Sequence, residues 1–183
     1  MRMKKVCVFC GSSAGKGDAY KTMAENMGEV LTQNNFGLVY GGASIGVMGT
    51  MADQVLGAEG EVWGVMPKSL VDWEVAHNGL THFETVDSMH TRKQKMYDWS
   101  DAFVAMPGGF GTLDELCEIL TWAQLKYHQK PCFLLNFNGF FDHLVKHFKH
   151  INKEGFLSDE HLSLITVVDS FSELENELKK CLA

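Results

Sequence analysis

Short, almost wholly apolar runs alternate along the chain with longer segments in which apolar residues recur every three or four positions. An apolar run without alternation is typical of a strand buried on both faces, and the longer spacing indicates a helix with one buried side. The pattern predicts strands at residues 6–10, 38–40, 61–66, 83–86, 102–106, 132–136 and 165–168. It predicts helices at residues 18–33, after the glycine loop 41–49, at 88–99, 112–128 and 140–152, and after a capping box at 170–173.

Strands that alternate with helices predict a doubly wound, Rossmann-like α/β fold, in which helices cover both faces of a parallel sheet. No linker, repeat or low-complexity stretch divides the 183 residues. We therefore predict a single nucleotide-binding domain over residues 1–183. Ligands of such a fold bind beyond the carboxyl ends of the strands, so the segments that follow the strands are the candidate site.

The most informative of these segments is the loop that follows the strand at 102–106. Its glycines, Gly108, Gly109 and Gly111, allow bare backbone N–H groups to approach a ligand, because glycine has no Cβ. The helix that begins near Thr112 adds unpaired N–H groups and the positive end of its dipole, which together favour an anion. Glu115 would then place a carboxylate beside a phosphate pocket, which suggests catalysis. Thr112 and Glu115 also fit a capping box, and the two interpretations are compatible.

Two other strand ends carry small residues, namely Gly11, Ser12 and Ser13 after the first strand and the Gly42 loop after the second. One such loop is usually an ordinary turn, but three at converging strand ends favour a nucleotide or a sugar phosphate. Neither familiar phosphate motif fits. The segment 11–17 is one residue short of a P-loop, with Gly17 in place of the magnesium-binding hydroxyl, and the G-x-G-x-x-G spacing is absent. NAD is therefore disfavoured.

Arg92 is the second ionisable residue of interest. The chain has only two arginines, and Arg2 lies at the terminus. Arg92 lies near the start of the helix that leads into the strand at 102–106, where its planar fork can hold a phosphate, a ribose or a carboxylate. The alternative is an arginine on an exposed helix surface.

Charge and hydropathy exclude several classes of function. The net charge of −7 argues against general nucleic-acid or membrane-surface binding, because such partners attract an excess of Lys and Arg. No run approaches the ~18 apolar residues of a membrane span. The apolar run at 6–10 is too short for a secretory signal. We expect a cytoplasmic protein with no nucleic-acid or membrane partner.

Metal and redox chemistry are also disfavoured. His143, His147 and His150 share one stripe of a predicted helix, but an apolar stripe opposes them, so we expect them on the solvated face. Cys7 and Cys10 lie three apart in a strand and point to opposite faces. We expect these two cysteines to be buried apolar residues, and the same holds for Cys117, Cys132 and Cys181. No metal site and no cofactor are predicted.

Taken together, these segments closely resemble the LOG ("lonely guy") family, the cytokinin riboside 5'-monophosphate phosphoribohydrolases. The resemblance rests on Pro107-Gly-Gly-Phe-Gly-Thr-Leu-Asp-Glu115, on Met89-His-Thr-Arg92-Lys93, and on the Gly41-Gly42 loop with Gly46 and Met48-Gly49. Cys10-Gly11-Ser12-Ser13 and Thr121-Trp122-Ala-Gln-Leu125 extend it over nearly the whole chain. Trp73 departs from the more polar residue expected in bacterial relatives, which bears on the base end of the substrate.

The resemblance implies hydrolysis of the N-glycosidic bond of an adenine or N6-modified adenine nucleoside 5'-monophosphate, which yields the base and ribose 5-phosphate. It implies that Arg92 and Glu115 are the catalytic pair, and that Met89 and Lys93 lie beside the nucleotide. It also implies a homodimer. The phosphate would be held by Gly108, Gly109, Gly111 and Thr112, with Gly11, Ser12, Ser13 and Gly42 in the adjoining loops.

Three questions stay open from the residues alone. Glu115 can act as base, nucleophile or electrostatic partner, with Arg92 orienting it and favouring its charged form. AMP and a prenylated adenine nucleotide are both candidate substrates. A non-catalytic nucleotide or cofactor carrier on the same fold is the alternative function, although a carrier needs neither Arg92 nor Glu115. The label "lysine decarboxylase", often carried by this family, is rejected because no lysine stands out as a pyridoxal phosphate Schiff base.

Overall fold

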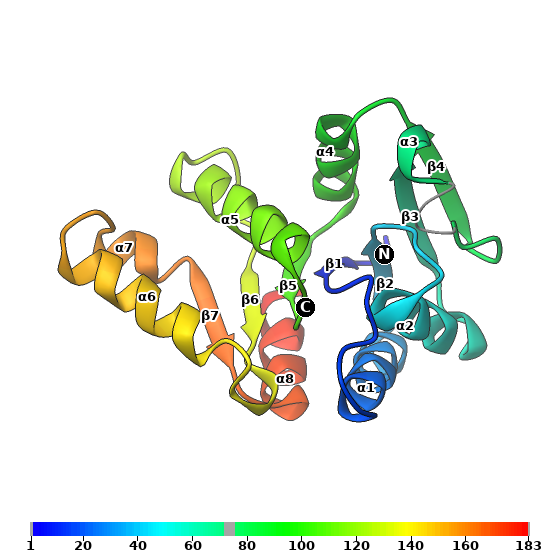
Figure 1. The fold of residues 1–183 in the computed structure, drawn as a ribbon, viewed down its shortest axis with the longest axis horizontal. Helices are drawn as coiled ribbons and strands as arrows, with labels where there is room; N and C mark the ends of the chain where they lie inside the picture. The colour runs from blue at the N-terminus through cyan, green and yellow to red at the C-terminus, as the bar shows by residue number, and fades with distance from the viewer. Residues whose placement is uncertain (1, 72–75, 183) are drawn as a thin grey trace.

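The predicted strands form one parallel sheet (Figure 1). The computed structural model describes residues 2–71 and 76–182. Within them the strand order is β4-β3-β2-β1-β5-β6-β7, and every neighbouring pair is parallel. The strands are β1 (Lys5–Phe9), β2 (Gly37–Tyr40), β3 (Val62–Pro67), β4 (His82–Val86), β5 (Ala102–Ala105), β6 (Cys132–Leu135) and β7 (Ile165–Val168). The predicted doubly wound fold is confirmed.

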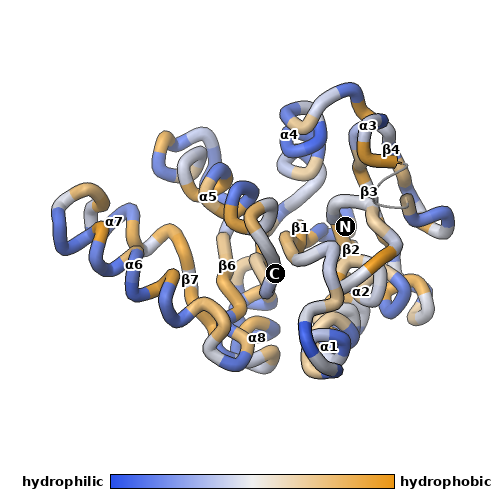
Figure 2. Tube along the Cα trace, in the orientation of Figure 1, coloured by the Kyte–Doolittle hydropathy of each residue, from blue (hydrophilic) through white to orange (hydrophobic). Residues whose placement is uncertain are grey.

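Helices cover both faces of the sheet, and each face has its own apolar cluster. One cluster includes Met23, Met51 and Leu174, from α1, α2 and α8, and the other includes Met96 and Leu116, from α4 and α5. Figure 2 shows turns of α6 and α8 that alternate between hydrophilic and hydrophobic residues, as one-sided burial requires. The helices are α1 (Ala19–Gln33), α2 (Gly46–Gly57), α3 (Lys68–Val71), α4 (Met89–Trp99), α5 (Phe110–Gln124), α6 (Asp142–Lys153), α7 (Asp159–Leu162) and α8 (Phe171–Leu182), with a 3₁₀ turn at Phe137–Gly139.

The strand order reverses beside β1, and this reversal positions the candidate site. The chain adds β2, β3 and β4 on one side of β1 and then returns to add β5, β6 and β7 on the other side. Loops therefore leave the carboxyl ends of β1 and β5 in opposite directions and open a crevice between them. Gly11 N–H donates to the Pro107 carbonyl at 3.2 Å, which ties the two loops together at this point.

The helix after the glycine loop differs from its prediction at both ends. It begins at Phe110, with Gly109 as an extended N-cap that makes no side-chain cap, so the proposed capping box of Thr112 and Glu115 is wrong. It ends at Gln124, because the backbone reverses at Lys126, whose φ is 63°. At the last helix the Ser170 hydroxyl accepts the Glu173 N–H at 3.2 Å, as the capping box predicts, but the Glu173 carboxylate accepts the Asp169 N–H at 3.0 Å, one residue before the predicted Ser170 N–H.

The cysteine prediction is correct for three residues and wrong for two. Cys7 and Cys10 belong to the apolar clusters on opposite faces of the sheet, and Cys132 is also buried. Cys117 and Cys181 are exposed, because each lies on the outer side of a helix whose opposite side packs on the sheet. All five thiols are free. Among the described residues, no helix combines the length and apolar character that crossing a membrane requires.

The packing of α1 on α2 yields a stability prediction. Gly28 is buried at this contact, and a Cβ there would lie 2.6 Å from Gln54 Cγ and 2.8 Å from Gln54 Cβ. Gly28→Leu is expected to lower the free energy of unfolding by ~1–3 kcal/mol, because the two helices must separate. Urea denaturation measures the change. Gly57→Leu is the control, since a Cβ at Gly57 meets nothing within 4 Å. Equal stability of the two variants would contradict this packing.

Candidate active site

A cavity of about 650 Å³ opens at the carboxyl ends of β1 and β5. It is the place where the strand order predicts a ligand. Every predicted site residue lines it except Gly42 and Lys93. The predicted residues in the lining are Gly11, Ser12, Ser13, Met89, Arg92, Gly108, Gly109, Gly111, Thr112 and Glu115.

The floor of the cavity is a backbone cradle formed by the glycine loop after β5 and the loop after β1. A Cβ on Gly108 would overlap the Thr112 hydroxyl and lie 2.8 Å from Gly11 N, so the close approach of the two loops requires glycine at position 108. The first-turn N–H groups of α5 have no partner within the helix and open toward this loop. Thr112 Oγ1 is buried and has no hydrogen-bond partner among the residues that the structure describes. The Thr112 hydroxyl is therefore a buried polar group that a ligand or a water in the cavity can satisfy.

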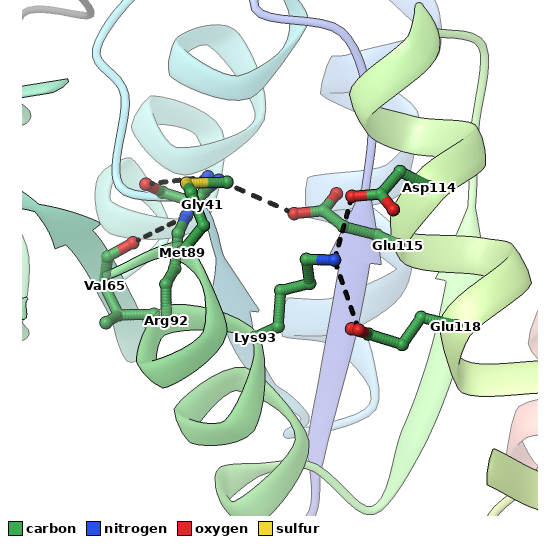
Figure 3. A network of polar contacts seen from close by, with 8 residues as sticks. All are labelled: Gly41, Val65, Met89, Arg92, Lys93, Asp114, Glu115 and Glu118. Atoms are coloured by element: carbon green, nitrogen blue, oxygen red, sulfur yellow. Dashed lines mark hydrogen bonds and ion pairs between the residues drawn. The ribbon is translucent and has the colours of Figure 1, made fainter.

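Arg92 is a buried side chain, with only 4% of the residue exposed. Its Nε donates to the Val65 carbonyl at 3.2 Å and its Nη2 donates to the Gly41 carbonyl at 3.3 Å (Figure 3). A Cβ on Gly41 would overlap Nη2, so the glycine after β2 makes room for the guanidinium. The interpretation of Arg92 as an exposed surface arginine is therefore wrong.

Glu115 faces Arg92 from the opposite side of the cavity. Only 6% of the residue is exposed, and its Oε1 lies 3.7 Å from Arg92 Nη1. Figure 3 shows the two side chains reaching toward each other from α4 and α5. Charges taken out of water are costly unless they are paired and hydrogen-bonded. The guanidinium donates to the two carbonyls and lies at ion-pair distance from the carboxylate. A carboxylate and a guanidinium are thus fixed beside the glycine cradle.

Lys93 and Gly42 take different positions. Lys93 Nζ lies between two carboxylates of α5, at 2.9 Å from Asp114 Oδ2 and 3.2 Å from Glu118 Oε1. Burial opposes its charge, but the hydrogen bonds and charges of these carboxylates outweigh burial and raise the pKa of Lys93. Gly42 supplies a turn with φ of 86° against Phe83, outside the cavity lining. Trp73 lies outside the described residues.

Several lining residues were not predicted from the sequence. Tyr20 and Phe140 form one wall, with ring centroids 6.2 Å apart in an edge-to-face contact. These two residues are distant in the sequence, and only the neighbouring position of β1, β5 and β6 brings them together. Lys16, Val47, Met48, Leu70, Cys10, Gly15, Pro107 and Phe110 complete the lining.

Within residues 2–71 and 76–182, no group of three or more His, Cys, Asp or Glu side chains is arranged to hold a metal ion. His143, His147 and His150 are exposed on α6, as the apolar stripe predicts.

The five thiols generate a chemical prediction. Burial, and then the charge of Glu115, raises the pKa of Cys10, and burial raises the pKa of Cys132 to about 12. A raised pKa leaves less thiolate at a given pH, so these thiols stay protonated near pH 8. Cys117 and Cys181 are exposed and are expected to react first with an aromatic disulfide reagent, and the other three only after unfolding. Cys117 should be the slower of the two, because partial burial and the charge of Asp114 raise its pKa. Cys181→Ser should remove one fast thiol. Fast reaction of a third thiol in the native protein would contradict these positions.

Sequence comparisons identify the relatives of this chain. Residues 48–178 match a protein-family model described as "Possible lysine decarboxylase". The chain is 43% identical over 178 residues to the cytokinin riboside 5'-monophosphate phosphoribohydrolase LOG1 of Arabidopsis thaliana, covering 97% of this chain and 84% of the relative. It is 44% identical over 165 residues to the cytokinin riboside 5'-monophosphate phosphoribohydrolase of Rhodococcoides fascians, covering 90% of this chain and 83% of the relative.

Solved structures share the fold at low sequence identity. The molybdenum cofactor binding protein from Rippkaea orientalis aligns with a TM-score of 0.76 at 20% identity, over 100% of this chain and 99% of that one. The Moco carrier protein from Chlamydomonas reinhardtii aligns with a TM-score of 0.72 at 20% identity, over 99% and 98%. These likenesses show the fold alone. The family follows from the far closer sequence relatives: the chain belongs to the LOG family of cytokinin riboside 5'-monophosphate phosphoribohydrolases.

Proposed function

We propose that this chain hydrolyses the N-glycosidic bond of an adenine or N6-modified, cytokinin-type adenine nucleoside 5'-monophosphate. The products are the free base and ribose 5-phosphate. The observation that carries the proposal is the buried Arg92–Glu115 pair in the same cavity as the glycine cradle. Relatives at 43–44% identity are named for this activity.

The cradle is proposed to hold the 5'-phosphate. The loop of Gly11, Ser12 and Ser13 and the first turn of α5 face the same cavity, and a helix N-terminus favours an anion. The Thr112 hydroxyl supports this role, because an unsatisfied buried hydroxyl costs ~1–3 kcal/mol and a phosphate or an ordered water can relieve that cost. Phosphate binding then supplies remote binding energy that orients the ribose at the reacting bond.

Glu115 is proposed to act at the ribose. When the C1'–N9 bond breaks, its electron pair leaves with the base and the sugar becomes oxocarbenium-like, which a nearby carboxylate stabilises. A water oxygen then bonds to C1', one water proton is released, and the base nitrogen takes up a proton. Arg92, fixed by the carbonyls of Val65 and Gly41, presents its positive charge to the carboxylate at 3.7 Å and favours its charged form.

The residues of the cavity are less suited to catalysis by a cysteine nucleophile or by a Schiff-base lysine. Cys10 lines the cavity, but its raised pKa keeps it a thiol and disfavours it as a nucleophile. Lys16 is the lysine found in the described lining, and it is exposed, whereas a Schiff-base lysine is desolvated to lower its pKa. A decarboxylase mechanism therefore has no support in this site. A carrier would bind nucleotide without needing the buried ion pair.

Met89 is proposed to lie against the nucleotide from the first turn of α4, where it lines the cavity and is 40% exposed.

We also propose a cytoplasmic homodimer. Phe110, 92% exposed, lines the cavity and offers an apolar contact to a second copy of the chain. Sedimentation equilibrium tests the dimer, and a monomer at micromolar concentration would refute it.

The proposed activity predicts base release from AMP and from N6-isopentenyladenosine 5'-monophosphate. Glu115→Gln is expected to lower kcat by about 10²–10⁴-fold, because the transition-state carboxylate is lost, and to leave nucleotide affinity within about threefold. Chromatography of free base and calorimetry of binding measure the two quantities. The unphosphorylated riboside should react far more slowly than the monophosphate, since it lacks the 5'-phosphate.

Glu29→Gln, on the exposed side of α1, is the control for loss of a carboxylate and should keep the parent activity. If the parent releases no base from either monophosphate but binds both, the chain is a carrier and the proposal fails. Comparison of kcat/KM for the two monophosphates decides which is the working substrate.

A further inference from the structure

Lys93 joins the two helices that carry the proposed catalytic pair. It follows Arg92 on α4, and its Nζ contacts Asp114 Oδ2 at 2.9 Å and Glu118 Oε1 at 3.2 Å on α5. Asp114 directly precedes Glu115. Figure 3 shows the Lys93 ammonium between the two carboxylates, next to the gap that Arg92 and Glu115 span. Lys93 is therefore adjacent in sequence to Arg92, and Asp114 is adjacent to Glu115. The contacts of Lys93 are shorter than the 3.7 Å between Arg92 and Glu115.

The spacing of the catalytic pair depends on the elements that carry it. Arg92 is anchored to the loop after β2 and to the middle of β3 through the carbonyls of Gly41 and Val65. Glu115 moves with α5. The 3.7 Å between Nη1 and Oε1 exceeds the ~3.2 Å upper limit of an ordinary N–H···O hydrogen bond. Because Glu115 is carried by α5, the distance between guanidinium and carboxylate depends on how far α5 stands from α4, where Tyr97 and Trp122 also meet edge to face with ring centroids 5.3 Å apart.

The Lys93 contacts join the two helices at a partly buried position. The Lys93 side chain is 12% exposed and that of Glu118 is 23% exposed, so this attraction is less screened than that of a surface pair, whereas the Asp114 side chain is 59% exposed. Without the ammonium, Asp114 and Glu118 would be like charges one helical turn apart, which repel each other. Glu115 lies between them in sequence and would share the excess negative charge.

We propose that Lys93 is a positioning residue that holds α5 against α4 and so sets the alignment of Glu115 with Arg92, without contact to the nucleotide. The proposal rests on the proposed function for its kinetic consequences and replaces the expectation that Lys93 lies beside the nucleotide. A displacement of about 1 Å at a reacting group can cost about 10²-fold in rate.

Lys93→Met removes the ammonium and keeps most of the stem. We expect kcat for AMP to fall at least 10-fold while KM stays within about threefold, because alignment and not binding is lost. Lys93→Arg should recover most of kcat, since it restores the cation. Lys95→Met is the matched control on the same helix, where Lys95 contacts Glu84 at 2.8 Å on another side, and it should remain within twofold of the parent.

The carboxylate partners supply a second, coupled test. The double variant Asp114→Asn with Glu118→Gln is expected to reproduce the kcat loss of Lys93→Met, and adding Lys93→Met to it should cause little further loss. A rise of 10-fold or more in KM with unchanged kcat in Lys93→Met would show a nucleotide contact and overturn the proposal. Kinetics equal to those of Lys95→Met would overturn it as well.

A crystal structure of Lys93→Met separates this proposal from the proposed function. We expect the Arg92–Glu115 separation to exceed that of the parent protein, solved in the same crystal form, by at least 0.5 Å. If the parent releases no base, the proposed activity fails, yet a widened pair still supports the positioning role. An unchanged separation overturns the positioning role, whatever the parent's activity.

Discussion

The attraction between Arg92 and Glu115 is the interaction on which the site depends. Both charges are more than nine-tenths buried, and such burial is unfavourable unless each charge keeps partners that replace water. The guanidinium meets this condition with two backbone carbonyls and the carboxylate. The two side chains come from helices that pack on different parts of the sheet, so the pair also joins the halves of the fold across the crevice.

The second constraint is the close approach of backbone to neighbouring groups at two glycines. Gly41 leaves room for the Arg92 guanidinium, and Gly108 leaves room for the Thr112 hydroxyl and for Gly11. Any side chain at these positions would displace a charge or a donor from the cavity. The reversal of strand order beside β1 brings these loops to one crevice, so topology and glycine placement together create the cradle and its neighbouring carboxylate.

Much of this arrangement could be predicted from the sequence, and the exceptions have physical causes. The apolar runs predicted the inner strands, because burial on both faces requires local hydrophobicity, whereas the edge strands β4 and β7 keep most of their residues at least partly exposed. The direction in which each side chain of α4 points could not be predicted from the sequence. Arg92 lines the cavity, whereas Lys93, the next residue, contacts α5. Thr112 failed as a cap because the extended Gly109 takes that position. Tyr20 and Phe140 were missed because only the assembled strand order places them on one wall.

The most direct test of the account is a crystal structure of the Glu115→Gln variant with AMP bound. The central claim is that the glycine cradle holds the 5'-phosphate and that the side chain at position 115 faces the glycosidic bond. The account predicts phosphate oxygens against the first-turn N–H groups of α5 and ribose C1' beside the introduced amide and the Arg92 guanidinium. A phosphate bound outside the cradle, or a ribose turned toward Tyr20 and Phe140, would contradict it.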